Sequence, residues 1–109
     1  MYARADYKPR IPEAKSLETY ISNDIAGFKK SESDLIVSRE QPIRFKDQIE
    51  FQVVFYSPAE GSTGNWEYVA YGEDGEYYLT FGVSSRTSAG LTAALPAFKA
   101  FIAGYRAGP

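Results

Sequence analysis

The sequence predicts an α+β fold in which an antiparallel β-sheet of about five strands is flanked by two helices, in the order β-α-β-β-β-β-α. Two segments, one near each end of the chain, carry apolar residues at helical spacing. Between them lie runs rich in β-branched and aromatic residues, separated by short segments that contain Gly, Pro and Ser. Consecutive strands joined by short turns favour antiparallel pairing, and helices outside that run favour the α+β class.

The first strand and the first helix are predicted within the first thirty residues. Weak alternation over the first eight residues predicts a short strand. A helix is expected from Leu17 to about Lys29, because Ser16 is a suitable N-cap and the apolar residues that follow repeat at helical spacing. This apolar stripe, which we expect to lie on the sheet, consists of Leu17, Tyr20, Ile21, Ile25 and Phe28.

The middle of the chain carries two extended segments and a loop. Residues 35–38 and 43–45 read as β-structure interrupted at Pro42, which suits an edge or a bend. Strict alternation over residues 48–56 predicts the clearest strand, followed by a loop over residues 57–64. One face of this strand carries Ile49, Phe51, Val53 and Phe55, and the other carries Gln48, Glu50, Gln52, Val54 and Tyr56.

A hairpin and a second helix complete the predicted fold. Residues 66–71 and 77–83 are expected to pair across an Asp74–Gly75 turn, which supplies the positive φ angles of a tight hairpin. Pro96 interrupts the last helical stripe, so we expect either a first turn ahead of a Pro-initiated helix or one kinked helix. We treat residues 1–109 as one domain, with residues 107–109 as a tail. The last stripe consists of Leu91, Leu95, Phe98, Ile102 and Tyr105.

Composition excludes several functional classes. The chain has no Cys and no His, which removes a thiol nucleophile, a Cys-based zinc site and a Ser-His-Asp triad. Its net charge of -2 gives no basic footprint for nucleic acid. We therefore expect no enzyme, no cofactor and no metal site. With no apolar run of membrane-spanning length, the chain is expected to be soluble, and cytoplasmic unless an N-terminal signal was removed.

Aromatic residues are more numerous than one core face requires. Aromatic side chains make up 16% of the chain, and the second face of the predicted sheet carries Tyr56 and Tyr78 together with either Trp66/Tyr68 or Val69/Tyr71. Such a face must be covered by a helix, a missing strand, a second subunit or a ligand. Ordinary packing beneath a helix is the simplest interpretation. The functional hypothesis is binding of a partner protein, or self-association into a homodimer, through Tyr56, Trp66, Tyr68, Tyr71 and Tyr78.

Other candidate sites carry less specific signals. Glu67, Glu73, Asp74 and Glu76 suggest a weak calcium site or a contact for a basic partner, although a solvated hairpin tip is the simpler interpretation. Glu50 and Glu67 could form a carboxylate pair on neighbouring strands, although exposed sheet residues are the simpler interpretation. Residues 84–88 read first as a helix cap and second as an anion site that includes Arg86. A small-molecule pocket between sheet and helix is the alternative to protein binding.

The second half of the chain resembles the PsbP-like superfamily, which includes DcrB-like proteins and type VI secretion adaptors. The resemblance rests on residues 77–81 (YYLTF), 94–98 (ALPAF) and 101–106 (FIAGYR), with a helix start at residues 12–21, and spans about Ile11 to Arg106. The family's aromatic opening hairpin is missing, so we expect a shortened domain or a chain that starts inside it.

The resemblance implies an antiparallel sheet flanked by helices, without shared catalytic machinery. Members of the superfamily act as accessory and binding proteins, among them extrinsic subunits of photosystem II, binders of a small nuclear GTPase and chaperone-like adaptors. The photosystem branch is linked to metal sites that involve histidine. Because this chain has no histidine, that role does not carry over.

Overall fold

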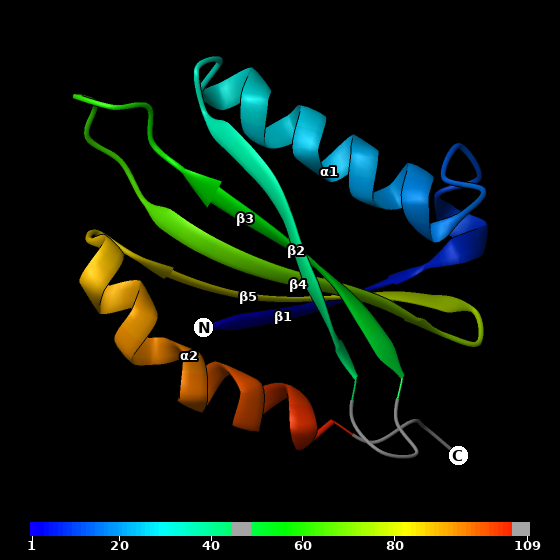
Figure 1. The fold of residues 1–109 in the computed structure, drawn as a ribbon. Coiled ribbons are helices and arrows are strands. Elements are labelled where there is room, and N and C mark those ends of the chain that lie inside the picture. The colour runs from blue at the N-terminus through cyan, green and yellow to red at the C-terminus, as the bar shows by residue number, and fades with distance from the viewer. Residues whose placement is uncertain (45–48, 106–109) are drawn as a thin grey trace.

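A computed structural model describes residues 1–44 and 49–105 and confirms the predicted α+β class and element order (Figure 1). The predicted positions Phe45 and Gln48 and the tail at residues 107–109 lie outside the described residues. In chain order the elements are β1 (Tyr2–Tyr7), a 3-10 turn η1 (Lys8–Arg10), α1 (Leu17–Ser31), β2 (Ile36–Arg44), β3 (Glu50–Ser57), β4 (Trp66–Asp74), β5 (Tyr77–Ser85) and α2 (Ser88–Ala103).

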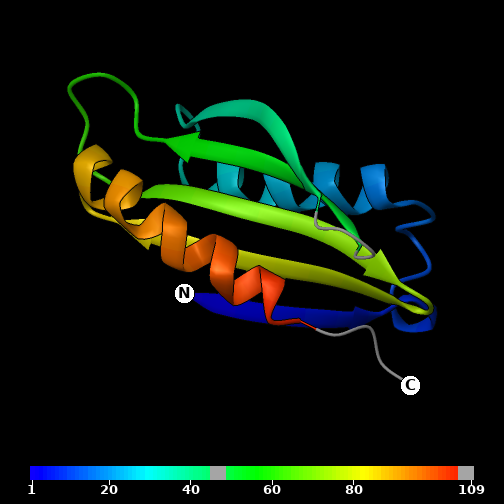
Figure 2. The same ribbon diagram turned by 60° about the horizontal axis from the view of Figure 1, so that its bottom comes forward.

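The five strands form one antiparallel sheet in the order β1-β5-β4-β3-β2. The N-terminal strand is therefore one edge of the sheet and β2 is the other. Helices α1 and α2 lie on opposite faces of this sheet (Figures 1 and 2). The described chain thus contains two apolar cores, one between α1 and the sheet and one between α2 and the sheet.

Strand register decides which aromatic side chains share a face. Val54 lies opposite Val69 and Gln52 lies opposite Tyr71, so Val69 and Tyr71 project from the same face as Tyr56. This is the α1 face. Trp66 and Tyr68 project from the α2 face. Of the two alternatives that the sequence leaves open for β4, the pair Val69/Tyr71 accompanies Tyr56 and Tyr78.

Both helices begin at hydroxyl caps. The Ser16 hydroxyl accepts a hydrogen bond from the Thr19 backbone N–H at 3.1 Å, as the sequence predicts for α1. The helix ends at Ser31, two residues beyond the expected end at Lys29. Thr87 caps α2 by accepting from the Gly90 N–H at 2.9 Å, which confirms the cap interpretation of residues 84–88.

Helix α2 continues without interruption through Pro96, so the structure has one helix rather than a separate first turn. Pro96 lacks the N–H that would bond the carbonyl of Thr92. Both residues are exposed, and water can therefore satisfy that carbonyl.

Two glycines are required by the geometry of β5. Gly75 has a φ of 56°, as expected for the Asp-Gly turn between β4 and β5. The Tyr2 ring lies against Gly82, and a Cβ atom at Gly82 would come within 2.2 Å of that ring. Any larger residue at Gly82 would therefore displace Tyr2 from β5.

The edge strand β2 is continuous but irregular. Its pairing with β3 shifts register between Glu40 and Ile43, at the position of Pro42. The sequence predicts an interruption there and an edge or a bend at Pro42. The structure confirms the edge position but accommodates the proline as a bulge in one strand. This is possible because an edge strand pairs on one side only, so the missing N–H breaks no second ladder.

Tyrosine hydroxyl groups fasten α1 to the sheet. The Tyr71 hydroxyl donates to the Asp24 carboxylate on α1 at 2.5 Å, and the Tyr56 and Tyr71 hydroxyl groups lie 2.8 Å apart. The Tyr20 hydroxyl donates to Asp6 on β1, and the Tyr78 hydroxyl donates to the Ala14 carbonyl at 3.0 Å. Burial and the bond to Asp24 raise the pKa of Tyr71, which keeps this hydroxyl a donor.

We predict that Asp24→Ala lowers the free energy of unfolding by about 1–3 kcal/mol, because it removes the carboxylate that accepts the hydrogen bond of the buried Tyr71 hydroxyl. Urea unfolding followed by circular dichroism measures this change. Ser22→Ala, at an exposed position on the same helix, is the control and is expected to change stability by less than about 0.5 kcal/mol. Equal stability of the Asp24 and Ser22 variants would contradict the anchoring role of Asp24.

Candidate functional site

The five predicted partner-binding residues do not lie together. Tyr56, Tyr71 and Tyr78 are buried beneath α1, with exposed fractions of 1%, 0% and 2%. For these three, the simple interpretation of packing beneath a helix holds, and a partner would reach them only if α1 moved. Trp66 and Tyr68 lie on the opposite face and remain partly exposed.

A row of three aromatic rings crosses β4 and β3 on the α2 face. The Phe55 ring centroid lies 6.1 Å from that of Trp66 and 4.9 Å from that of Tyr68, with tilted geometry in both pairs. All three side chains are partly exposed. Helix α2 packs mainly on β5 and β4, and the β3 part of this face lies beside the helix (Figure 1). We call Trp66, Phe55 and Tyr68 the aromatic strip.

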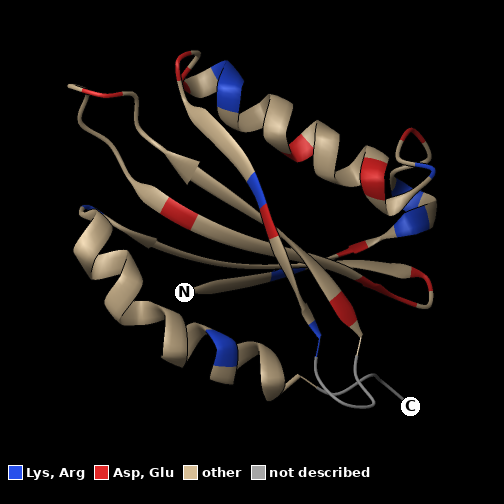
Figure 3. Ribbon diagram, in the orientation of Figure 1, with Lys and Arg blue, Asp and Glu red and all other residues tan. Residues whose placement is uncertain are grey.

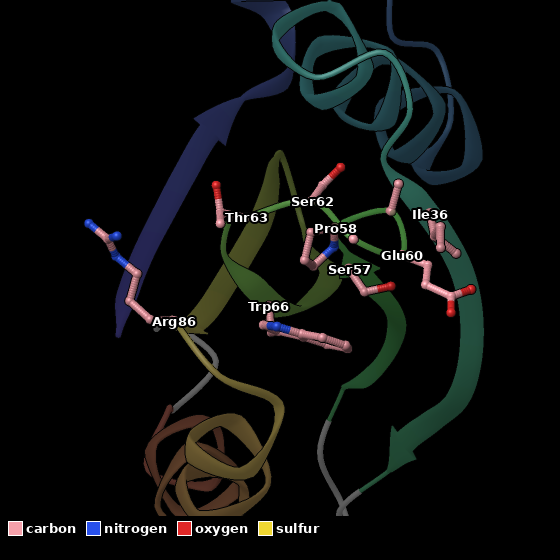
Figure 4. Close-up of a pocket in the computed structure, with 11 residues that line it drawn as sticks. Ile36, Ser57, Pro58, Glu60, Ser62, Thr63, Trp66 and Arg86 are labelled. Atoms are coloured by element: carbon pink, nitrogen blue, oxygen red, sulfur yellow. The ribbon is translucent and has the colours of Figure 1, made fainter.

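An open groove begins at the Trp66 end of the strip (Figure 4). It has a volume of about 640 Å³ and lies between the loop that follows β3 and the end of β5. The Trp66 indole lies between Arg86 on one side and Ser57 and Ile36 on the other (Figure 4). Ile36 is 50% exposed. The lining consists of Ile36, residues 57–64, Trp66 and Arg86.

A second open groove lies at the Tyr68 end, between β2 and α2. Its volume is about 450 Å³. Tyr68 and Val53 contribute from the sheet, and Leu95 and Phe98 contribute from α2. Charged groups line its rim. The lining consists of Glu40, Gln41, Pro42, Ile43, Arg44, Val53, Tyr68, Leu95, Phe98 and Lys99.

Phe55 is the member of the strip that the sequence did not single out. The alternation of residues 49–55 places Phe55 on the core face of β3, and the structure agrees. Its role at the strip depends on the register that sets it opposite Tyr68. The alternation therefore predicted the face of β3 on which Phe55 lies, but not the residues that neighbour it on β4.

Glu67 occupies an unusual position on the α1 face. Its Oε2 atom is buried and has no hydrogen-bond partner among the described residues. A small pocket of about 190 Å³ borders it near the C-terminal end of α1, where Phe28 and Tyr56 stack. Desolvation, with a contribution from the Asp24 charge, raises the pKa of Glu67 to about 7.

The proposed carboxylate pair of Glu50 and Glu67 is wrong. Glu67 lies opposite Tyr56, six positions along β3 from Glu50. Glu50 instead accepts hydrogen bonds from Arg44 and Gln52. The strands pair with a register that the sequence does not specify, and that register separates the two acids.

Two acids of the β4–β5 hairpin contact the rest of the chain. Lys8 lies 2.6 Å from Glu73, and the Tyr105 hydroxyl donates to Asp74 at 2.7 Å. Figure 3 shows acidic residues at this turn and basic residues near η1. Within residues 1–44 and 49–105, no group of three or more acidic side chains is arranged to hold a metal ion.

Comparison with protein-family models, with curated proteins and with solved structures found no match for this chain. Within the described residues, neither helix is long and apolar enough to cross a bilayer. The aromatic strip and its two grooves form the candidate binding site of this chain.

The raised pKa of Glu67 predicts a pH-dependent stability. Because the folded protein holds this proton more tightly than the unfolded chain, the contribution of protonated Glu67 is complete below about pH 4.5 and is lost as the pH rises through about 7. We expect Glu67→Gln to gain about 1–2 kcal/mol relative to wild type between pH 5 and pH 8, after allowance for solvent screening. Urea unfolding of both proteins at several pH values measures this difference.

Asp34→Asn, at an exposed acid between α1 and β2, is the control and is expected to show no such trend. A constant difference between Glu67→Gln and wild type across this pH range would show that Glu67 titrates as an ordinary exposed carboxylate.

Proposed function

We propose that this chain is a non-enzymatic accessory or adaptor domain that binds another protein through the aromatic strip. One observation carries the proposal: Trp66, Phe55 and Tyr68 form a contiguous row of partly exposed rings beside α2. Tyr and Trp are enriched at protein interfaces because they combine apolar area with a polar group.

The shape of the surface supports a macromolecular partner. Both grooves are open to solvent, and the strip joins them along the sheet. An extended segment or a loop of a partner would bury the rings in the centre and leave the groove rims wet, which is the usual anatomy of an interface.

The charged rim of the surface adds selectivity. In the described part of the chain, Arg86 lines the first groove and takes part in no ion pair. We expect a partner to place a carboxylate near Arg86, because a charge pair at the rim favours association and orientation more than affinity.

The resemblance to the PsbP-like superfamily points in the same direction, since its members act as accessory and binding proteins. We propose membership of that superfamily on residues 77–106, and the fold order is compatible with it. The membership is a separate proposal, and the aromatic strip does not depend on it.

A small-molecule binding function is the second candidate. The groove at Tyr68 favours it, because Leu95 and Phe98 of α2 and Val53 of the sheet offer apolar walls to a ligand. This function would place Tyr68, rather than Trp66, at the centre of the site.

We predict that Trp66→Ala and Tyr68→Ala each weaken partner binding by about tenfold or more, as expected for aromatic residues at the centre of an interface. Proteins retained from a source-cell extract by the immobilised wild-type chain are identified by mass spectrometry, and the purified partner is titrated by calorimetry. Trp66 is the single tryptophan of the chain, so its fluorescence reports binding at the strip independently.

Phe101→Ala is the matched control. It removes an aromatic ring that is 41% exposed on α2, away from the strip, and is expected to leave the affinity unchanged. Urea unfolding verifies that each variant is folded. Unchanged affinity in both strip variants would refute the proposal, as would retention of a small ligand that depends on Tyr68 in the absence of any retained protein.

A further inference from the structure

We propose that the free edge of β1 pairs with β1 of a second copy of this chain, which joins the two sheets about a twofold axis at Ala5. This inference goes beyond the proposed function, because it concerns the β1 edge of the sheet, whereas the aromatic strip lies on β3 and β4. The occupant of the edge is a second copy because β1 is complementary to itself in sequence, in backbone polarity and in charge.

The backbone of β1 presents hydrogen-bonding groups away from the sheet. The Lys8 N–H donates to the Glu76 carbonyl at 2.8 Å, which makes Lys8 a hydrogen-bonded partner of β5. In an antiparallel ladder, every second residue of an edge strand bonds the neighbouring strand, and the residues between them direct their backbone groups away from it. The N–H and C=O groups of Ala3, Ala5 and Tyr7 therefore point away from β5. In the strand order of the described sheet, β1 has a neighbour on its β5 side only.

The two edges of the sheet differ in their protection. Edge strands that avoid pairing with other chains carry proline, bulges or several charges. Strand β2 has Pro42 and a register shift between Glu40 and Ile43. Strand β1 has a regular register with β5 along its whole length and contains no proline. The outward edge of β1 is therefore suited to pairing.

Charge favours one register of the pairing. Arg4 and Asp6 project from the same face of β1, and their side chains lie 3.0 Å apart within one copy. When Ala5 of one copy lies opposite Ala5 of the other, Arg4 of each copy lies opposite Asp6 of the second copy. Opposite charges on facing positions stabilise antiparallel strand pairs, and this register provides two such pairs by symmetry.

The same register matches the outward backbone groups. Ala5 faces Ala5 of the second copy, and Ala3 faces Tyr7 of the second copy, so each outward N–H meets an outward carbonyl. This gives about six hydrogen bonds across the axis. A shift by one residue would bring inward-pointing groups to the edge and would break the match.

Exposed aromatic rings extend the contact on the α2 face. Tyr7 and Tyr77 have exposed fractions of 37% and 46%, and their ring centroids lie 5.3 Å apart. Beside β1 lies an open groove of about 470 Å³, lined by Ala5, Tyr7, Arg10 and Tyr77 together with Asp6 and Ile11. In the proposed dimer, Ala3 of the second copy lies next to Tyr7, where its small side chain leaves room for the ring.

Disulfide cross-linking tests the dimer. Because the chain has no cysteine, a single introduced cysteine can form a disulfide only with its equivalent in a second copy. In the proposed dimer the two Ala5 Cα atoms lie about 5.5 Å apart, within the range of a disulfide. We expect Ala5→Cys to form a covalent dimer under mild oxidation, measured on a non-reducing gel. Ala3→Cys is the matched control. Its two sulfur positions are offset by four residues, about 13 Å, and cannot be bridged.

The association itself is measured by sedimentation of the wild-type chain over a micromolar to millimolar range. A dimer is expected in this range, and Ala5→Pro, which removes an outward N–H at the axis, is expected to be monomeric but folded. A wild-type monomer throughout the range would overturn the proposal, as would a cross-link of Ala3→Cys as rapid as that of Ala5→Cys. Trp66→Ala is expected to remain dimeric, so this proposal and the proposed function fail independently.

Discussion

The packing of α1 on the sheet depends on hydrogen bonds between buried tyrosine hydroxyl groups and a few acceptors on or near the helix. Tyr71 donates to Asp24, and Tyr78 donates to the Ala14 carbonyl ahead of α1. A buried hydroxyl without a partner is costly, so these bonds permit few positions of the helix. The stacked rings of Tyr20 and Tyr78, with centroids 4.6 Å apart, add apolar contact to the same surface. The position of α1 on the sheet therefore depends on the strand register that places these tyrosines on the α1 face.

Local signals in the sequence were sufficient for the elements of this fold. The alternation of residues 49–55, the cap at Ser16 and the Asp74–Gly75 turn each specify structure through neighbouring residues, and the structure agrees with all three. The sequence left open whether the strand continues at Pro42 and whether one helix continues through Pro96, and the structure has a continuous strand and a continuous helix. Both depend on surroundings that tolerate a missing N–H, an outer edge in one case and a solvent-facing carbonyl in the other.

The candidate site was predicted less well, because its geometry depends on strand register. Trp66–Tyr71 carries aromatic residues on both faces, so its sequence does not reveal which residues face α1, and a shift of one residue would exchange the faces. Three of the five predicted residues are beneath α1, whereas Phe55 joins Trp66 and Tyr68 in the strip. The same dependence explains Glu67, whose neighbour across the ladder is Tyr56 rather than Glu50.

The two faces of the sheet therefore differ in how much surface they leave accessible to a partner. The α1 face is held by directional hydrogen bonds, whereas the α2 face leaves the aromatic strip partly exposed. Pairing of two β1 edges about an axis normal to the sheet would place both α2 helices, and hence both strips, on the same side of the dimer. A partner with two copies of a recognition segment would then bind the second strip as an intramolecular event, at a high effective concentration. The free edge would in this way strengthen binding at a surface that it does not touch.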